Sequence, residues 1–72
     1  MFNNARDVLE ALGGHQAVAD ALGMDWRKVH NWKTTGRRIP AEMWPRVAAI
    51  PGAKKLGITV NLLASLPYNP PY

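Results

Sequence analysis

A chain of 72 residues makes one domain, and a domain this small buries only about 60% of the surface that its unfolded chain exposes. It has no cysteine and only two histidines, which excludes disulfides and ordinary structural zinc sites, so we expect no metal and no cofactor, with self-association as the remaining common source of stability. The formal net charge of +4 favours a polyanionic partner, either nucleic acid or an anionic membrane surface.

A first helix is predicted over about residues 4–12. Its apolar side chains recur at i, i+3, i+4 and i+7, which places them on one helical face that we expect to turn toward the core. An asparagine precedes the helix as an available N-cap, and two glycines follow it as a stop. The apolar face consists of Ala5, Val8, Leu9 and Leu12.

The next two predicted helices are joined by a short turn. The second helix covers about residues 16–22 and ends at Gly23, which we expect in a left-handed cap conformation. The third helix covers about residues 26–34. Asp25 precedes it and can accept hydrogen bonds from the unpaired amides of its first turn.

Four residues of these two helices have the spacing of a helix-turn-helix. Two helices that cross steeply need a small side chain where they touch, and the turn between them often needs a glycine. Ala19 meets the first need and Gly23 the second, while Val29 and Trp32 share one face of the third helix. This spacing predicts a packed helical pair whose second member has a defined outer face.

Pro40 is predicted as the first residue of a fourth helix. Pro45 should kink or restart this helix near Trp44, unless its first turn is a 3₁₀ turn. The sequence Pro51-Gly52 should then end it. The apolar face of this helix consists of Met43, Val47 and Ile50.

A last helix is predicted after Thr59, its expected cap, with Val60, Leu63 and Leu66 on one face. No strand is predicted, because the single β-branched run is too short to outweigh the helical spacing after it. The fold class is therefore all-α, a compact bundle of about five short helices over residues 1–66. Residues 67–72 are predicted to form a Pro/Tyr-rich tail.

The outer face of the third helix is predicted to contact DNA bases. At about 100° per residue its two apolar residues fix the inner side, and the opposite side consists of Arg27, His30 and Asn31. Arg27 has donors for guanine O6 and N7, and Asn31 can pair with adenine N6 and N7. Trp26 either lies against a thymine methyl or a sugar, or is half-buried packing. The predicted base contacts are Arg27, Asn31, Trp26 and His30.

Basic and polar side chains around this helix are the predicted phosphate contacts. Residues 26–41 include five basic residues and no acid, and a loop that leaves the groove must pass a phosphate strand. The start of the second helix is a further candidate, because its unpaired amides favour an anion. His15, at that start, is predicted as a cap or a surface residue. The predicted phosphate contacts are Gln16, Lys28, Lys33, Thr34, Arg37 and Arg38.

The chain resembles the Cro/repressor-type helix-turn-helix family of small phage and bacterial regulators. Residues 15–24 match the first half of the motif and residues 29–32 the second, while Gly-Arg-Arg-Ile-Pro at 36–40 is similar to the exit loop of the YdaS-like branch. The resemblance covers roughly residues 9–50 and implies a lambda-repressor-like fold. It also implies that Trp26, Arg27 and Asn31 occupy base-reading positions, although a small or amide-bearing residue is usual in place of Trp26.

These observations predict sequence-specific binding to double-stranded DNA by a transcriptional regulator, most simply a repressor that occupies a promoter. A homodimer on a palindromic site is expected, because one reading helix contacts too few base pairs. Its interface is predicted at Leu62, Leu66 and Tyr68, with Leu63 turned inward. The alternatives are that the leucines close the monomer core, and that Tyr68 and Tyr72 belong to a mobile tail or to one folded over its own core.

The alternative function is an antitoxin-like or adaptor module that binds a partner protein through the last helix or the tail. An enzyme is not expected, because one serine, no cysteine and scattered acids supply neither an activated nucleophile nor paired carboxylates. No apolar run approaches the roughly 18 to 20 residues of a membrane span, and the N-terminal region lacks a signal pattern. We therefore expect a cytoplasmic, nucleoid-associated protein with no membrane partner.

Overall fold

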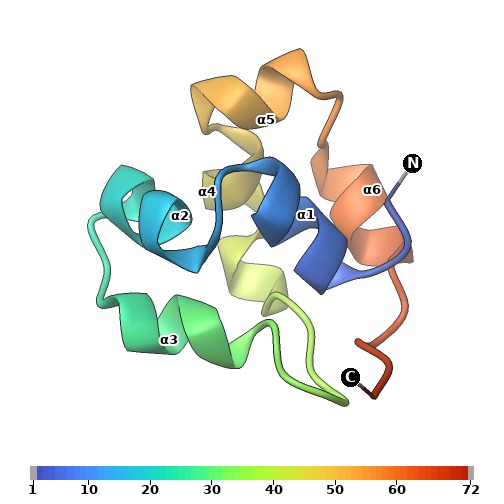
Figure 1. The fold of residues 1–72 in the computed structure, drawn as a ribbon. Helices are drawn as coiled ribbons and strands as arrows, with labels where there is room; N and C mark the ends of the chain where they lie inside the picture. Colours follow the sequence, from blue (N-terminus) through green and yellow to red (C-terminus); the bar gives the residue numbers. More distant parts are fainter. Residues whose placement is uncertain (1, 72) are drawn as a thin grey trace.

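Six short α-helices and one 3₁₀ turn form within residues 2–71, the part of the chain that the computed structural model describes, and no strand occurs there. In Figure 1, α1 lies at the centre, with α2 and α3 to one side, α6 to the other and α5 above. The elements are α1 (Ala5–Ala11), α2 (His15–Leu22), α3 (Trp26–Asn31), η1 (Ala41–Met43), α4 (Trp44–Ala48), α5 (Pro51–Lys55) and α6 (Val60–Ser65).

Side-chain caps begin three of the helices, and the sequence predicted each of them. Asn4 Oδ1 accepts a hydrogen bond from the Asp7 amide at 3.0 Å, and Asp25 Oδ1 accepts one from the Arg27 amide at 2.9 Å. Thr59 Oγ1 accepts from the Leu62 amide at 3.1 Å. Each cap pairs an amide of the first turn that has no partner within its helix.

Two helix boundaries differ from the prediction. The third helix ends at Asn31 and not near Thr34. The carbonyls of Trp32 and Thr34 there accept hydrogen bonds from Asn69, far along the chain. Pro51 begins α5, a helix that was not predicted from the sequence. A proline suits this position because the amide that it lacks has no partner in the first turn of a helix.

The fourth predicted helix divides as the alternative for Pro45 allowed. Its first turn is the 3₁₀ helix η1, and α4 restarts at Trp44 with Pro45 in its first turn. Pro40 is extended, with ψ 142°, and precedes η1 instead of belonging to it. Because Pro45 lies in a first turn, its missing amide removes no bond from the helix interior.

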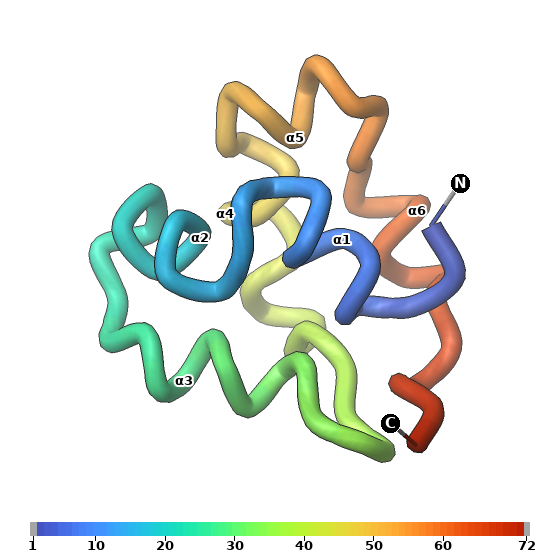
Figure 2. The backbone as a smooth tube through the Cα atoms, viewed as in Figure 1, coloured from blue at the N-terminus to red at the C-terminus, as the bar shows by residue number. Residues whose placement is uncertain are grey.

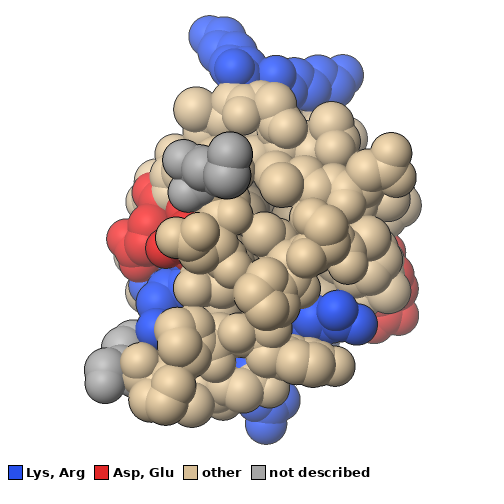
Figure 3. Space-filling view, turned by 90° about the vertical axis from the view of Figure 1, so that its right-hand side faces the viewer, with Lys and Arg blue, Asp and Glu red and all other residues tan. Residues whose placement is uncertain are grey.

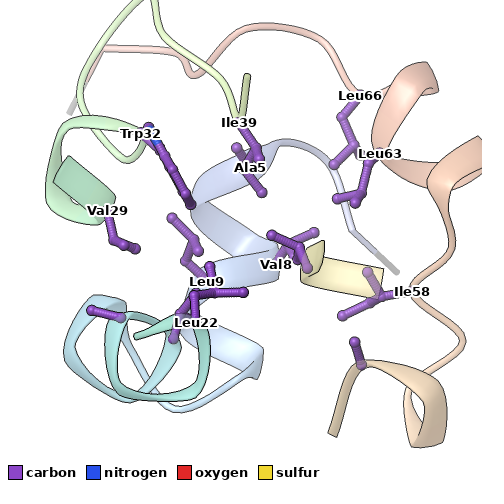
Figure 4. Packing of buried hydrophobic residues seen from close by; sticks show 14 residues of the cluster. Ala5, Val8, Leu9, Leu22, Val29, Trp32, Ile39, Ile58, Leu63 and Leu66 are labelled. Carbon is purple, nitrogen blue, oxygen red and sulfur yellow. The ribbon is translucent and has the colours of Figure 1, made fainter. Parts of the chain in front are cut away.

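All six helices contribute side chains to one apolar core. Figure 4 shows Val8 and Leu9 of α1 surrounded by side chains from the other elements, among them Leu22, Val29 and Ile58. Leu63 turns inward as predicted, and Leu66 is only 5% exposed and belongs to the same cluster. Of the alternatives for Leu66, the structure shows the one in which it closes the monomer core, because a domain of this size needs its volume inside.

Residues 67–71 contain no regular secondary structure, but they fold back over the domain. The tube in Figure 2 runs from α6 down to the loop that follows α3. The amide of Asn69 donates to the carbonyl of Arg37 at 2.9 Å, and the amide of Gly36 donates to the carbonyl of Asn69 at 2.9 Å. Of the alternatives for this segment, the structure shows the folded one; Tyr72 lies outside the described residues.

Within residues 2–71, no helix has both the length and the apolar character needed to cross a bilayer.

Candidate nucleic-acid interface

α2 and α3 pack against each other across the turn at residues 23–25, as the helix-turn-helix spacing predicts. Gly23 has φ 67° and ψ 36°, and its amide donates to the carbonyls of Ala19 and Asp20. This left-handed conformation costs a glycine little and reverses the chain within a few residues. Ala19, Val29 and Trp32 are all buried, so the predicted packing frame is confirmed.

The opposite side of α3 is open to solvent along the lower edge of the molecule (Figure 1). The Arg27 side chain is 75% exposed, and Lys28 and Asn31 are exposed as well. Arg27 and Asn31 are four residues apart and thus lie one turn apart on the same face. The structure therefore brings together the two side chains that were predicted to read base edges.

Asp25 and Trp26 orient the Arg27 side chain at the start of α3. Its guanidinium lies 3.6 Å from the Asp25 carboxylate and 5.5 Å from the centre of the Trp26 ring. Both contacts are at the surface and are weak in water. They bias the guanidinium toward the beginning of the helix while leaving it free to exchange them for a stronger partner.

Trp26, His15 and His30 form a ring cluster at the junction of α2 and α3. The His15 ring centre lies 5.6 Å from that of Trp26 and 4.9 Å from that of His30. Trp26 thus packs against both histidine rings and remains 42% exposed. His15 is not the cap of α2, since that position belongs to Gly14; the sequence analysis missed its packing because the partners lie on another helix.

Lys33 is turned toward α1 and is engaged within the domain. Its Nζ lies 2.7 Å from Oε1 of Glu10, and its side chain is only 14% exposed. The hydrogen bond and the charge of Lys33 lower the pKa of Glu10 below its usual value. Lys33 therefore ties the end of α3 to α1 through an ion pair, while the phosphate contact at Lys33 stays a prediction.

The same ammonium group also acts on His15. Nζ of Lys33 lies 3.4 Å from Nδ1 of His15. Partial burial, followed by the positive charges of Lys33 and His30, lowers the pKa of His15, while Glu10 opposes this with a smaller effect. The neutral imidazole is thus favoured in the unbound protein.

Of the remaining predicted phosphate contacts, some are exposed and others contact neighbouring groups of the domain. Gln16, at the start of α2, and Arg37, in the loop after α3, are exposed. Thr34 Oγ1 donates to the carbonyl of Asn31 at 2.8 Å and keeps its lone pairs as acceptors only. The Arg38 guanidinium lies 5.7 Å from the Trp44 ring and 4.8 Å from the Tyr68 ring.

The sequence model of one family, described as bacterial toxin YdaS, matches residues 5–59. The chain belongs to the bacterial toxin YdaS family. This family is of the helix-turn-helix type, and its YdaS members are regulatory or toxin–antitoxin-related proteins. No curated protein and no solved structure matches the chain.

The YdaS match includes every element from α1 to α5 and all of the predicted base and phosphate contacts. It ends at Thr59, before α6 and the segment that folds back over the loop after α3. The part of this YdaS protein that fastens that loop therefore lies beyond the family match.

Proposed function

We propose that this protein binds specific sites on double-stranded DNA through α3 and regulates transcription, most simply as a repressor that occupies a promoter. The division of α3 into two faces carries the proposal. Val29 is fully buried, so Arg27 and Asn31 must point outward, one turn apart. Arg27 then donates two hydrogen bonds to guanine and Asn31 pairs with adenine in the major groove.

Phosphate contacts on both sides of α3 would hold the helix in the groove. Lys28 on its flank, Gln16 at the start of α2 and Arg37 in the exit loop are exposed and near the base-reading face in sequence. Arg38 would add a second guanidinium from the same loop, and Thr34 could donate to a phosphate oxygen only by giving up its bond to the Asn31 carbonyl. Such contacts supply affinity and orientation, whereas the base contacts supply specificity.

We further propose that two copies bind a palindromic site, since a single short helix contacts few base pairs. With Leu66 in the core, the candidates for the contact are Leu62, which is half-buried, and Tyr68, which is exposed. Figure 3 shows that the side of the molecule bearing α6 is mostly uncharged across its middle, with basic side chains above and below it and acidic ones at its edges. Such a face suits a contact between like-charged copies, because their basic groups need not meet.

A protein-binding role, of the toxin–antitoxin kind, is the second candidate. The description of the family as a bacterial toxin favours it. So do two exposed apolar side chains, Leu56 at the end of α5 and Val60 at the start of α6, since exposed apolar groups suit a contact with another protein. In this role the partner would cover these side chains and leave α3 unoccupied.

Selection of bound sequences from a random duplex pool at near-physiological salt tests the first proposal. The expected result is a two-fold motif with half-sites about 34 Å apart. An Arg27→Ala variant should recover the motif with one position relaxed, while Lys55→Ala, which removes an exposed charge from α5, should recover it unchanged. A pool without enrichment contradicts DNA reading by α3 and favours the protein-binding role.

A further inference from the structure

We propose that Asn69 is a positioning residue for DNA binding: it holds the loop after α3 in the conformation that presents Arg37 and Arg38 to phosphates. The inference rests on the proposed function and deepens it. It assigns a role in DNA binding to a segment that lies outside the family match and that sequence analysis placed in a tail.

Asn69 is only 3% exposed, and both polar atoms of its side chain form hydrogen bonds. Its Nδ2 donates to the carbonyl of Trp32 at 2.6 Å and to that of Thr34 at 2.9 Å. Its Oδ1 accepts from the amide of Arg6 at 3.0 Å. One side chain thus joins the end of α3, the loop after it and the first turn of α1.

The backbone of Asn69 adds two more bonds to the same loop. Its amide donates to the carbonyl of Arg37, and its carbonyl accepts from the amide of Gly36, each at 2.9 Å. Gly36 has φ 75°, so the loop turns sharply between its two basic residues and α3. The loop has no helix or strand of its own, and Asn69 supplies hydrogen bonds that a regular element would otherwise provide.

The neighbours of Asn69 strengthen this attachment. Arg6 donates from Nε to the carbonyl of Lys33 at 3.0 Å and from Nη2 to the carbonyl of Pro70 at 2.9 Å. The Tyr68 ring lies 4.8 Å from the Arg38 guanidinium, and the Trp44 ring lies 5.7 Å from it. Arg38, in the loop after α3, therefore lies near two rings, Trp44 at the start of α4 and Tyr68 in the C-terminal segment.

A loop that is ordered before binding loses less conformational entropy when phosphates arrive. The bonds of Asn69 fix the carbonyls of Trp32, Thr34 and Arg37, and with them the directions of the side chains between. If these bonds are lost, the loop can still carry its charges, but it no longer holds them at fixed positions. The number of phosphates neutralised should then fall.

The test compares Asn69→Asp with Asn61→Asp. Both variants change the net charge equally, but Asn61 is exposed on α6, whereas aspartate at 69 cannot donate to Trp32 and Thr34. The readout is the slope of log Kd against log salt for duplex DNA, at a temperature where circular dichroism shows each variant folded. We expect Asn69→Asp to reduce the slope by about one to two units, the contribution of one or two phosphates, and Asn61→Asp to change it much less.

A merely structural role would leave the slope unchanged once Kd is corrected for the folded fraction that circular dichroism measures at each salt concentration. Tyr68→Ala is the second variant, since it removes the ring beside Arg38 and leaves the backbone bonds of Asn69 in place. It is measured on a duplex with a single half-site, where the proposed dimer contact plays no part, and we expect a slope reduced by up to about one unit. Faster hydrogen exchange of the Gly36 amide in Asn69→Asp would support the loosened loop.

Wild-type protein that binds duplex DNA, together with variants at 69 and 68 that keep its slope, would overturn the positioning role and leave the proposed function intact. Wild-type protein that binds no duplex would overturn both. Asn69→Asp that lowers the slope as far as Arg37→Ala combined with Arg38→Ala would identify the loop as the site of the effect.

Discussion

Lys28 and Lys33 carry the same charge five positions apart, but their surroundings give them different roles. Lys28 is exposed on the flank of α3, and Lys33 is turned against α1, where Glu10 accepts a hydrogen bond from it. An exposed lysine is available for counterion release on a polyanion, whereas a lysine turned against a neighbouring helix contributes to the fold. A charge count along the sequence cannot separate the two.

Arg27→Ala is expected to weaken binding to the preferred site by about 1 to 3 kcal/mol and to relax one base position, because a bidentate base contact is lost. Lys28→Ala should weaken all sequences alike and reduce the salt slope by about one unit. A shift assay on the preferred site and on a scrambled duplex measures both. Equal losses on the two duplexes for Arg27→Ala would contradict base reading by this residue.

Glu10→Gln is expected to reduce stability near neutral pH and to have little effect in acid. The pKa of Glu10 is lowered in the folded protein, so its contribution is present above the usual value of 4.5 and is lost as the pH falls through the folded value. Because the carboxylate is well exposed, the contribution should be about 1 kcal/mol or less. Urea unfolding at neutral and acidic pH measures it.

Glu42→Gln is the matched control for this titration, since it removes an exposed acid of η1. A Glu10→Gln variant with the same pH dependence of unfolding as wild type would show that the ion pair with Lys33 does not stabilise the fold.

At the scale of elements, the start of α3 combines a structural and an electrostatic task in Asp25. Its carboxylate caps the Arg27 amide at 2.9 Å and also lies 3.6 Å from the Arg27 guanidinium. The cap stabilises the short reading helix, while the negative charge opposes the approach of phosphates. The two effects act on different measurements and can be separated by substitution.

Asp25→Ala should lower the free energy of unfolding by about 1 kcal/mol, the usual cost of losing an N-cap. Asp25→Ser should keep most of that stability, because a serine hydroxyl can cap the same amide. Both variants should bind non-specific DNA more tightly than wild type, since both remove an acid from the reading face. Asp25→Ser with the full stability loss of Asp25→Ala would show that capping is not what Asp25 contributes.

The boundaries of the elements show which local signals suffice. Asn4, Asp25 and Thr59 begin helices where the sequence predicted, since a cap acts within three residues. The end of α3 was not predicted, because it depends on hydrogen bonds from Asn69. Pro51 was read as a stop and instead begins α5; a proline both ends one helix and suits the first turn of the next.

At the scale of the whole molecule, the single core leaves little margin for loss. Leu9, which is fully buried on α1, contacts the cluster that joins the α2–α3 side to the α6 side (Figure 4). Truncation of a buried leucine costs about 2 to 5 kcal/mol, which is comparable to the stability of a small domain. Because Val29 of α3 and Leu63 of α6 belong to the same core, a loss of packing on the α6 side of α1 also lowers the stability of α3.

Sedimentation velocity with and without the selected duplex tests the proposed dimer. We expect two copies on a two-fold site. A duplex that contains a single half-site should give a weaker complex with one copy. Leu62→Lys, at a half-buried position of the proposed contact, should prevent the second copy from binding cooperatively, with circular dichroism as the check that the domain is folded. One copy per two-fold site for the wild type would contradict the dimer.

The sequence by itself determined the helical class, the helix starts, the left-handed turn at Gly23 and the outward face of α3. These depend on periodicity and on contacts within a few residues, which a linear pattern contains. Only the tertiary structure decided that Lys33 pairs with Glu10, that Leu66 lies in the core, and that Asn69 fastens the loop after α3. Each of these joins residues far apart along the chain, and packing of the whole domain chooses such partners.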